Sequence, residues 1–292
     1  MAGSMTVETF AHGDLVFDVT DAGPTDGAPV VLLHGFPQHL SSWDLIAPVL
    51  HEAGLRTLAP DQRGYSPGAR PRPTRAYRLE HLVADVEALV AALGQGPVHL
   101  VGHDWGAAVA WATALRRPHL VRSLTAVSVP HPSAFAHAVR TSRQGRKSWY
   151  MLAFQPRGLA EALLDPARPA GRARLAESLR GSGQSAERAE RDVAFLASPG
   201  AFRGAVSWYR GVPHEIRRGA GPVTCAVPTA MVWGDRDPFC TRRPVEATAA
   251  YVQAPYRLDV LPGVGHWVPE QAPRALADAV LWAVRTADAD AG

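Results

Sequence analysis

Apolar and polar residues follow two different periods along most of this chain. Short apolar runs, such as those at residues 30–33 and 98–101, are typical of strands buried on both faces of a sheet. Residues 79–93 instead place Leu and Val three and four positions apart, which predicts an amphipathic helix that ends at Gly94. Strands that alternate with helices predict an α/β fold, with a mostly parallel central sheet covered by helices on both faces.

The same two periods locate the other elements of the chain. We predict strands at residues 6–10, 15–20, 29–33, 56–59, 98–101, 120–129, 229–233 and 257–261. We predict helices at residues 41–50, 79–93, 107–115, 243–251 and 271–285, followed by a loose tail at residues 286–292.

The alternation of strand and helix stops between residues 133 and 224. This segment is polar and rich in Arg and aromatic residues, and it has no convincing strand; helical stretches lie near residues 134–140, 159–164, 172–179 and 186–196. We therefore predict a helical cap, residues 133–224, inserted into a core domain made of residues 1–132 and 225–292. A length of 292 residues is large for one domain, which fits an inserted subdomain.

Charge and composition argue against several classes of partner. The 30 basic and 27 acidic residues give a net charge of +3 without any Lys/Arg run, so nothing favours nucleic acid or an anionic membrane. No apolar stretch reaches the length of a membrane span, and the first residues lack the pattern of a signal peptide. Cys225 and Cys240 form neither a disulfide framework nor a metal motif, which agrees with a cytoplasmic location. A monomer and a homodimer both fit this pattern.

Residues 102–106, Gly-His-Asp-Trp-Gly, lie between a predicted strand and a predicted helix. This is the pattern of a nucleophile elbow, in which flanking glycines permit a tight turn that exposes the central side chain. The central residue is Asp104, where an esterase would carry Ser. Because a carboxylate is already ionised at neutral pH, Asp104 can attack a saturated carbon directly and form an alkyl ester.

A second glycine turn lies at residues 34–37, His-Gly-Phe-Pro, after an earlier strand. It can supply the backbone N–H of Phe36, which with that of Trp105 would form an oxyanion hole. We expect His34 to be structural because it directly follows a buried strand. In the turn at residues 61–66 we expect an Asp61–Arg63 pair that stabilises the loop.

An acid and a histidine follow the elbow in chain order. Asp237 lies in the turn after the strand at residues 229–233, and His266 lies between Gly265 and Trp267 after the last strand. The order nucleophile, acid, histidine is that of a hydrolase triad on an α/β sheet. Asp235 competes for the role of the acid, and we prefer Asp237 because it lies deeper in the loop and precedes a proline.

These motifs resemble those of the α/β-hydrolase family and, within it, of the epoxide hydrolases. The resemblance covers nearly the whole chain, through residues 34–37, 61–66, 102–106, 234–237 and 265–267. Epoxide hydrolases carry two cap tyrosines that hold the epoxide oxygen. Tyr150, shortly before Phe-Gln-Pro, and Tyr209, within Ser-Trp-Tyr-Arg, match them, although Ser replaces the usual Asn.

The resemblance implies a two-step reaction that needs no cofactor and no metal. Asp104 would attack an epoxide carbon while the two tyrosines hold the oxygen, and His266, oriented by Asp237, would then activate water to release a vicinal diol. The oxyanion of the second step would be held by the N–H groups of Phe36 and Trp105. The small-molecule epoxide is expected to contact Phe36, Pro37, Trp105, Trp149, Phe154, Trp208 and Trp267.

Haloalkane dehalogenases resemble this chain equally at Asp104, Trp105 and His266. That reaction needs two halide donors, Trp105 and a second Trp or Asn, and Phe36 stands where many dehalogenases carry Asn. Trp149 or Trp208 could be the second donor, so this alternative stays open. An Arg after the nucleophile, typical of fluoroacetate-type enzymes, is replaced by Trp105, and an ester hydrolase is disfavoured by Asp104. A non-catalytic or biosynthetic protein on the same fold is the remaining alternative.

Overall fold

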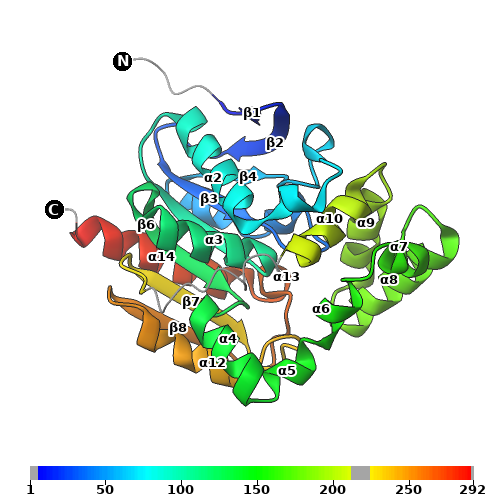
Figure 1. Cartoon of the computed structure of the whole chain (residues 1–292). Helices are drawn as coiled ribbons and strands as arrows, with labels where there is room; N and C mark the ends of the chain where they lie inside the picture. The colour runs from blue at the N-terminus through cyan, green and yellow to red at the C-terminus, as the bar shows by residue number, and fades with distance from the viewer. Residues whose placement is uncertain (1–5, 212–223, 291–292) are drawn as a thin grey trace.

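The computed structural model describes residues 6–211 and 224–290, which are built around an eight-stranded sheet (Figure 1). The strand order is β1-β2-β4-β3-β5-β6-β7-β8. The first two pairings, β1 with β2 and β2 with β4, are antiparallel, and all later pairings are parallel. The strands span β1 Thr9–His12, β2 Leu15–Ala22, β3 Ala28–Leu33, β4 Leu55–Pro60, β5 Val98–His103, β6 Val121–Val127, β7 Thr229–Gly234 and β8 Tyr256–Leu261.

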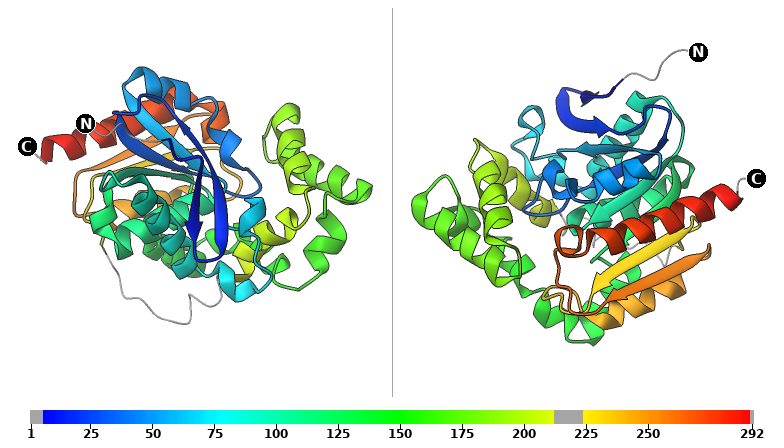
Figure 2. Two further views of the ribbon diagram at one scale, coloured as in Figure 1. Left: turned by 90° about the horizontal axis from the view of Figure 1, so that it is seen from above. Right: turned by 180° about the vertical axis from the view of Figure 1, so that it is seen from behind.

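Alternate residues of the central strands pack against opposite faces of the sheet, as a period of two requires. In β3, Val31 and Leu33 join the apolar cluster under helices α2 (Leu79–Leu93) and α3 (Trp105–Arg116), whereas Val30 and Leu32 join the cluster under α1 (Ala47–Glu52) and α14 (Pro273–Asp290). In the view from behind, α14 lies beside β7 and runs nearly along it (Figure 2, right). The predicted α/β fold with helices on both faces is therefore confirmed.

The parallel strands all end at one edge of the sheet, and their following loops meet there. Between β6 and β7 the regular elements of the described residues are helices, and these lie beyond that edge (Figure 1). They are α4 Pro132–Thr141, α5 Gln144–Lys147, α6 Trp149–Ala153, α7 Leu159–Leu164, α8 Pro169–Gly181, α9 Ala186–Leu196 and α10 Ala201–Gly211. This arrangement is compatible with a cap at residues 133–224, of which residues 212–223 lie outside the described part.

Four predicted elements differ from the structure. The helix expected at residues 41–50 is a 3-10 turn, Leu40–Trp43, followed by α1, because Pro48 lacks a backbone donor and sits in the first turn of a helix. The last predicted helix begins at Pro273 as α14, and a separate short helix, α13 Val268–Gln271, precedes it. The expected loose tail is helical to residue 290, since Asp288 pairs with Arg122 at 2.6 Å and Ala287 is buried.

Helix α12, Arg242–Ala247, and a 3-10 turn at Thr248–Tyr251 together replace the helix predicted at residues 243–251. Further 3-10 turns span Pro67–Ala69, Thr74–Tyr77 and Pro118–Leu120. Across the described residues, no helix combines the length and the apolar character that crossing a membrane would demand.

Candidate active site

Asp104 stands at the turn between β5 and α3 with φ 51° and ψ −120°, a conformation that residues other than glycine rarely adopt. The turn needs glycine on both sides. A Cβ on Gly102 would lie 2.3 Å from the carbonyl oxygen of Gly106, and a Cβ on Gly106 would lie 2.0 Å from that of Leu33. The backbone therefore turns tightly enough to leave the Asp104 side chain 14% exposed at the edge of the sheet.

Two backbone donors and one histidine surround the Asp104 carboxylate. The Phe36 N–H donates to Oδ1 at 2.9 Å, the Trp105 N–H also hydrogen-bonds the carboxylate, and Nε2 of His266 lies 3.5 Å from Oδ2. Burial alone would raise the pKa of Asp104, but these partners, His266 above all, lower it below its usual value. The carboxylate is therefore ionised at neutral pH and able to act as a nucleophile.

His266 is held between Asp104 and Asp237. Its Nδ1 lies 2.9 Å from Oδ2 of Asp237, whose Oδ1 accepts the N–H groups of Phe239 at 2.7 Å and Cys240 at 3.0 Å. Burial would lower the pKa of His266, but the two carboxylates raise it to about 10. The competing Asp235 instead accepts the N–H of Gly263 at 2.7 Å, on the surface.

The loop that carries His266 is held in place by His103, the residue before the nucleophile. His103 is fully buried, with Nε2 2.9 Å from the carbonyl oxygen of His266 and Nδ1 3.0 Å from Oε1 of Gln38. The hydroxyl of Ser128 donates to the same carbonyl at 3.1 Å. Burial lowers the pKa of His103 to about 4, so this ring is a neutral support rather than a second base.

Tyr209 on α10 and Tyr150 on α6 face each other with ring centroids 6.1 Å apart. The Tyr209 ring packs edge-on against Trp105 at 5.0 Å and Phe36 at 5.4 Å, the two residues whose N–H groups contact Asp104. Burial raises the pKa of both phenols, and the charge of Asp104 raises it further. Both hydroxyls are therefore protonated at neutral pH and can donate to a developing anion.

The aromatic residues expected to contact a substrate divide into two groups. Phe36, Trp105 and Phe154 surround the Tyr209 ring, with the Phe154 centroid 4.6 Å away. Pro37 is buried directly after Phe36. These four lie at the candidate site, where their contact with a substrate stays a prediction.

The other three residues expected to contact a substrate are Trp149, Trp208 and Trp267. Trp208 is 2% exposed and its indole N–H donates to the carbonyl oxygen of Arg63 at 2.7 Å; Trp267 is equally buried and donates to Ser182 at 3.2 Å. Trp208 packs against Trp105 with ring centroids 6.0 Å apart, and Trp267 packs against His266 at 5.1 Å, so contact of either ring with a substrate stays a prediction. Trp149 is 66% exposed, so most of its ring lies in water.

The sequence analysis did not identify Phe239, which packs against both His266 and Tyr150. Its ring is 4.8 Å from that of His266 and 5.4 Å from that of Tyr150. Its position two residues after Asp237 was the available signal. The same loop is held by α5, where Gln144 donates to the Phe239 carbonyl at 2.8 Å and Lys147 donates to the Asp237 carbonyl at 2.9 Å. Nothing in the sequence pattern indicated these last two contacts.

The turn at residues 61–66 also differs from expectation. Arg63 pairs with Asp85 of α2 through both carboxylate oxygens, at 2.7 and 2.6 Å, rather than with Asp61. Asp61 accepts the N–H of Leu40 at 2.8 Å, and burial raises its pKa to about 7. The expected loop-stabilising pair is therefore replaced by a contact to a distant helix, which spacing within the turn could not show. His34 has the buried, structural position expected of it.

Comparison with known proteins places this fold and site in a family. Residues 28–273 match the model of the alpha/beta hydrolase fold. Epoxide hydrolase A of Mycobacterium tuberculosis is 33% identical over 90% of this chain and 92% of its own length, and the AB hydrolase superfamily protein YfhM of Bacillus subtilis is 31% identical over 91% and 93%. The crystal structure of epoxide hydrolase A from Mycobacterium thermoresistibile, at 28% identity, superposes with a TM-score of 0.80 over 96% of this chain and 97% of that one. The chain therefore belongs to the α/β-hydrolase family, in the group that contains the epoxide hydrolases.

Proposed function

We propose that this protein is an epoxide hydrolase that converts an epoxide and water to a vicinal diol through a covalent ester on Asp104. The observation that carries the proposal is the pair of protonated phenols, Tyr150 and Tyr209, which pack against each other close enough to an ionised Asp104 for its charge to raise the pKa of both. A carboxylate nucleophile with two proton donors opposite it suits the opening of a strained ether, whose oxygen becomes an anion. The relatives named epoxide hydrolases support the same reaction.

In the first step, Oδ2 of Asp104 attacks one epoxide carbon and the carbon–oxygen bond of the ring breaks. Oδ2 is the attacking oxygen, since Oδ1 accepts the N–H of Phe36 at 2.9 Å whereas Oδ2 has the longer contact of 3.5 Å to Nε2 of His266. One phenol donates its proton to the new alkoxide, while the other stabilises it by hydrogen bonding. The product of this step is a neutral hydroxyalkyl ester and a phenolate.

Ester formation changes the state of His266. The charge of Asp104 and its hydrogen bond both raise the pKa of His266 in the free enzyme, and both are lost when the carboxylate becomes an ester. Protonated His266 can therefore return its proton to the phenolate and become a neutral base. The order of events explains how one histidine pairs with the nucleophile before alkylation and activates water after it.

In the second step, Nε2 of His266 takes a proton from water, whose oxygen attacks Cγ of Asp104. Oδ1 becomes the oxyanion, held by the N–H groups of Phe36 and Trp105, which already hydrogen-bond the carboxylate. Collapse breaks the bond between Cγ and Oδ2, His266 protonates the leaving alkoxide, and the carboxyl proton returns to His266. The enzyme regains its starting state, and the diol carries one oxygen from Asp104.

The contacts of the tryptophans disfavour the dehalogenase alternative. The Trp208 indole N–H is bound to a protein carbonyl, Trp149 is exposed to water, and Phe36 has no side-chain donor. Of the residues expected as halide donors, this leaves Trp105, whose side chain already hydrogen-bonds Tyr209. A side-by-side assay of aryl epoxides, aliphatic epoxides and bromoalkanes separates the two reactions. We expect diol and no bromide.

Two further properties belong to this proposal. Residues 133–224 act as a cap that carries both tyrosines over the edge of the core; support comes from the helices between β6 and β7. The protein acts in the cytoplasm; support comes from Cys225 and Cys240, which are buried and unpaired.

A variant that stops after the first step tests the proposal. His266→Gln should accumulate the ester, so that peptide mass spectrometry after incubation with an epoxide finds the mass of that epoxide added to the peptide containing Asp104. Asp104→Ala should give neither adduct nor turnover. His119→Gln, at an exposed histidine on the Pro118–Leu120 turn, is the matched control and should turn over normally without an adduct. No adduct in His266→Gln across a varied epoxide panel would reject the covalent mechanism.

A further inference from the structure

Trp208 lies beside Tyr209 in the chain, and its indole N–H points to the core. Its side chain is buried, and its indole N–H donates to the backbone carbonyl of Arg63 at 2.7 Å. Its ring packs edge-on against Trp105 at 6.0 Å and Tyr65 at 6.2 Å. Trp208 therefore ties α10, which carries Tyr209, to the turn that follows β4 and to the residue next to the nucleophile.

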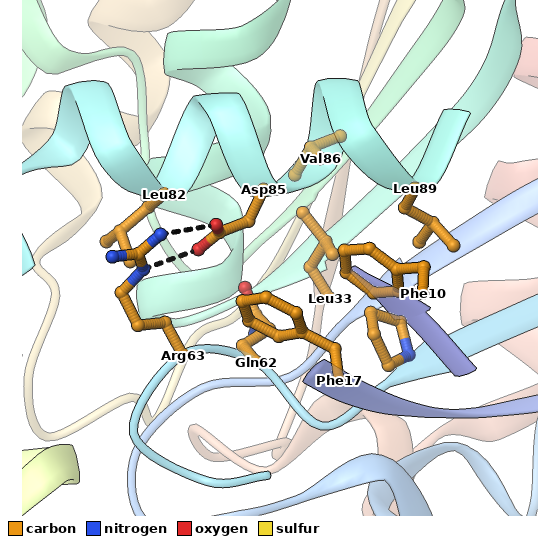
Figure 3. Close-up of a pocket in the computed structure, with 10 residues that line it drawn as sticks. Phe10, Phe17, Leu33, Gln62, Arg63, Leu82, Asp85, Val86 and Leu89 are labelled. Carbon is orange, nitrogen blue, oxygen red and sulfur yellow. Dashed lines mark hydrogen bonds and ion pairs between the residues drawn. The ribbon is translucent and has the colours of Figure 1, made fainter. Parts of the chain in front are cut away.

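The acceptor of this hydrogen bond is itself fixed in place. The Arg63 guanidinium binds both oxygens of Asp85 on α2, beside a small apolar cavity lined by Phe17 and Leu82 (Figure 3). It also donates to the Ala76 carbonyl at 3.1 Å. An ion pair with both partners buried holds the Arg63 backbone against the core, so its carbonyl is a stationary anchor for the indole.

Helix α10 rests directly on the backbone of the core. A Cβ on Gly204 would lie 2.4 Å from the carbonyl oxygen of Gly64, and a Cβ on Gly211 would lie 2.3 Å from that of Tyr77. Glycine contacts of this kind fix the distance between two backbones, but they contain no directional bond that fixes rotation of the helix about its axis. The Trp208 hydrogen bond supplies a directional contact.

We propose that Trp208 is a positioning residue for ring opening, which sets the rotation of α10 and with it the place of the Tyr209 hydroxyl over Asp104. The inference rests on the proposed role of Tyr209. The Tyr209 ring already packs on Trp105 and Phe36, so a small rotation of α10 would move the phenol relative to both oxyanion donors and to the nucleophile. A misplacement of about 1 Å at a reacting group is enough to slow a reaction by about 100-fold.

Trp208→Phe removes the indole N–H and keeps an aromatic ring at the position. In single-turnover kinetics we expect the rate constant of ester formation to fall by about tenfold or more. Hydrolysis of the ester should stay within twofold of the parent, because the hydrogen bonds that His266 and Asp237 make with each other and with the 237–240 loop involve no residue of α10. The double variant Trp208→Phe/Tyr209→Phe should form the ester no more slowly than Tyr209→Phe alone. This non-additivity is the signature of a residue that acts through Tyr209.

Trp43→Phe is the matched control. Trp43 is as buried as Trp208, but its indole N–H has no partner among the described residues, and it lies under the opposite face of the sheet. We expect both rate constants to stay unchanged in this variant. If Trp208→Phe does not fold, a benzothienylalanine introduced at position 208 alone keeps the shape of the ring and replaces the N–H with sulfur.

The outcomes separate this inference from the proposed function. If Tyr209→Phe forms the ester at the parent rate, the proposed role of Tyr209 is wrong. If Tyr209→Phe is slow but Trp208→Phe is not, the positioning role of Trp208 is overturned and the proposed function stands. The positioning role is equally overturned if Trp208→Phe slows both steps alike, or slows ester formation as much in the Tyr209→Phe background as in the parent.

Discussion

Asp104 and His266 stabilise each other's charged states. Burial opposes ionisation of both, yet the pKa of Asp104 is lowered and that of His266 is raised to about 10, because the opposite charges lie 3.5 Å apart. The free enzyme at neutral pH therefore holds an ion pair, with Asp237 as the second anion. Loss of the Asp104 charge on alkylation is what releases His266 as a base.

Asp104→Asn should lower the pKa of His266, because it removes one of the two carboxylates that raise it. The measurement is an NMR titration of the His266 ring in the parent and the variant. We expect the parent to titrate near pH 10 and the variant at lower pH. A variant that titrates at the parent value or above it would contradict the ion-pair account.

The same substitution should change how stability depends on pH. Folding raises the pKa of His266 above its unfolded value of about 6.5, so its proton contributes full stability below that pH and loses the contribution as pH rises through about 10. Urea denaturation at pH 6.5 and pH 9.5 should therefore show a larger loss of unfolding free energy for the parent than for Asp104→Asn. Equal losses in the two proteins would assign the pH dependence to other groups.

Helix α10 connects the core to the segment that carries Tyr150. Trp208 points to the core, whereas two residues later Arg210 donates to the Phe154 carbonyl at 3.0 Å and to both oxygens of Glu161, at 2.6 and 2.8 Å. Between them, the Tyr209 carbonyl accepts a hydrogen bond from Gln155 at 2.8 Å. Residues 208–210 of α10 thus contact Trp105, next to the nucleophile, and also bind the segment that follows Tyr150.

Arg210→Met should destabilise the fold by about 2 kcal/mol, because it leaves the Glu161 carboxylate and the Phe154 carbonyl without their charged donor. The Arg210 side chain is 8% exposed, so water cannot fully replace these contacts. Arg172→Met is the control: the Arg172–Glu190 pair is 41% and 52% exposed and should contribute less than about 0.5 kcal/mol. Urea denaturation gives both values. Equal effects of the two substitutions would show that Arg210 is not a structural link.

The elements predicted best from sequence are those whose own pattern determines them. Helix α2 has the predicted bounds, since its apolar stripe and the Gly94 that ends it are both visible in the sequence of the helix itself. Helix α10 was not predicted, because Gly204 and Gly211 lower its intrinsic propensity. The structure supplies the reason for both glycines: the core backbone approaches too closely for a side chain. Helices α5 and α6, of four and five residues, are too short for a period to be visible.

At the scale of the whole molecule, the fold brings distant residues to one edge. Asp104 follows β5, Asp237 follows β7 and His266 follows β8, and parallel strands place all three loops at their carboxyl ends. The sequence therefore predicted which loops would meet. It could not predict which aromatic side chains would face the site, because Trp208 and Phe239 are oriented by packing between helices and loops far apart in the chain.

The covalent route makes a claim about the whole catalytic cycle that one isotope experiment tests directly. With enzyme in excess over epoxide in water enriched in oxygen-18, a single turnover should release a diol without the label, since its new oxygen comes from Asp104. The label should then be found in the peptide that contains Asp104. Oxygen-18 in the diol of the first turnover, with an unlabelled Asp104 peptide, would mean that water attacks the epoxide directly and would contradict the account.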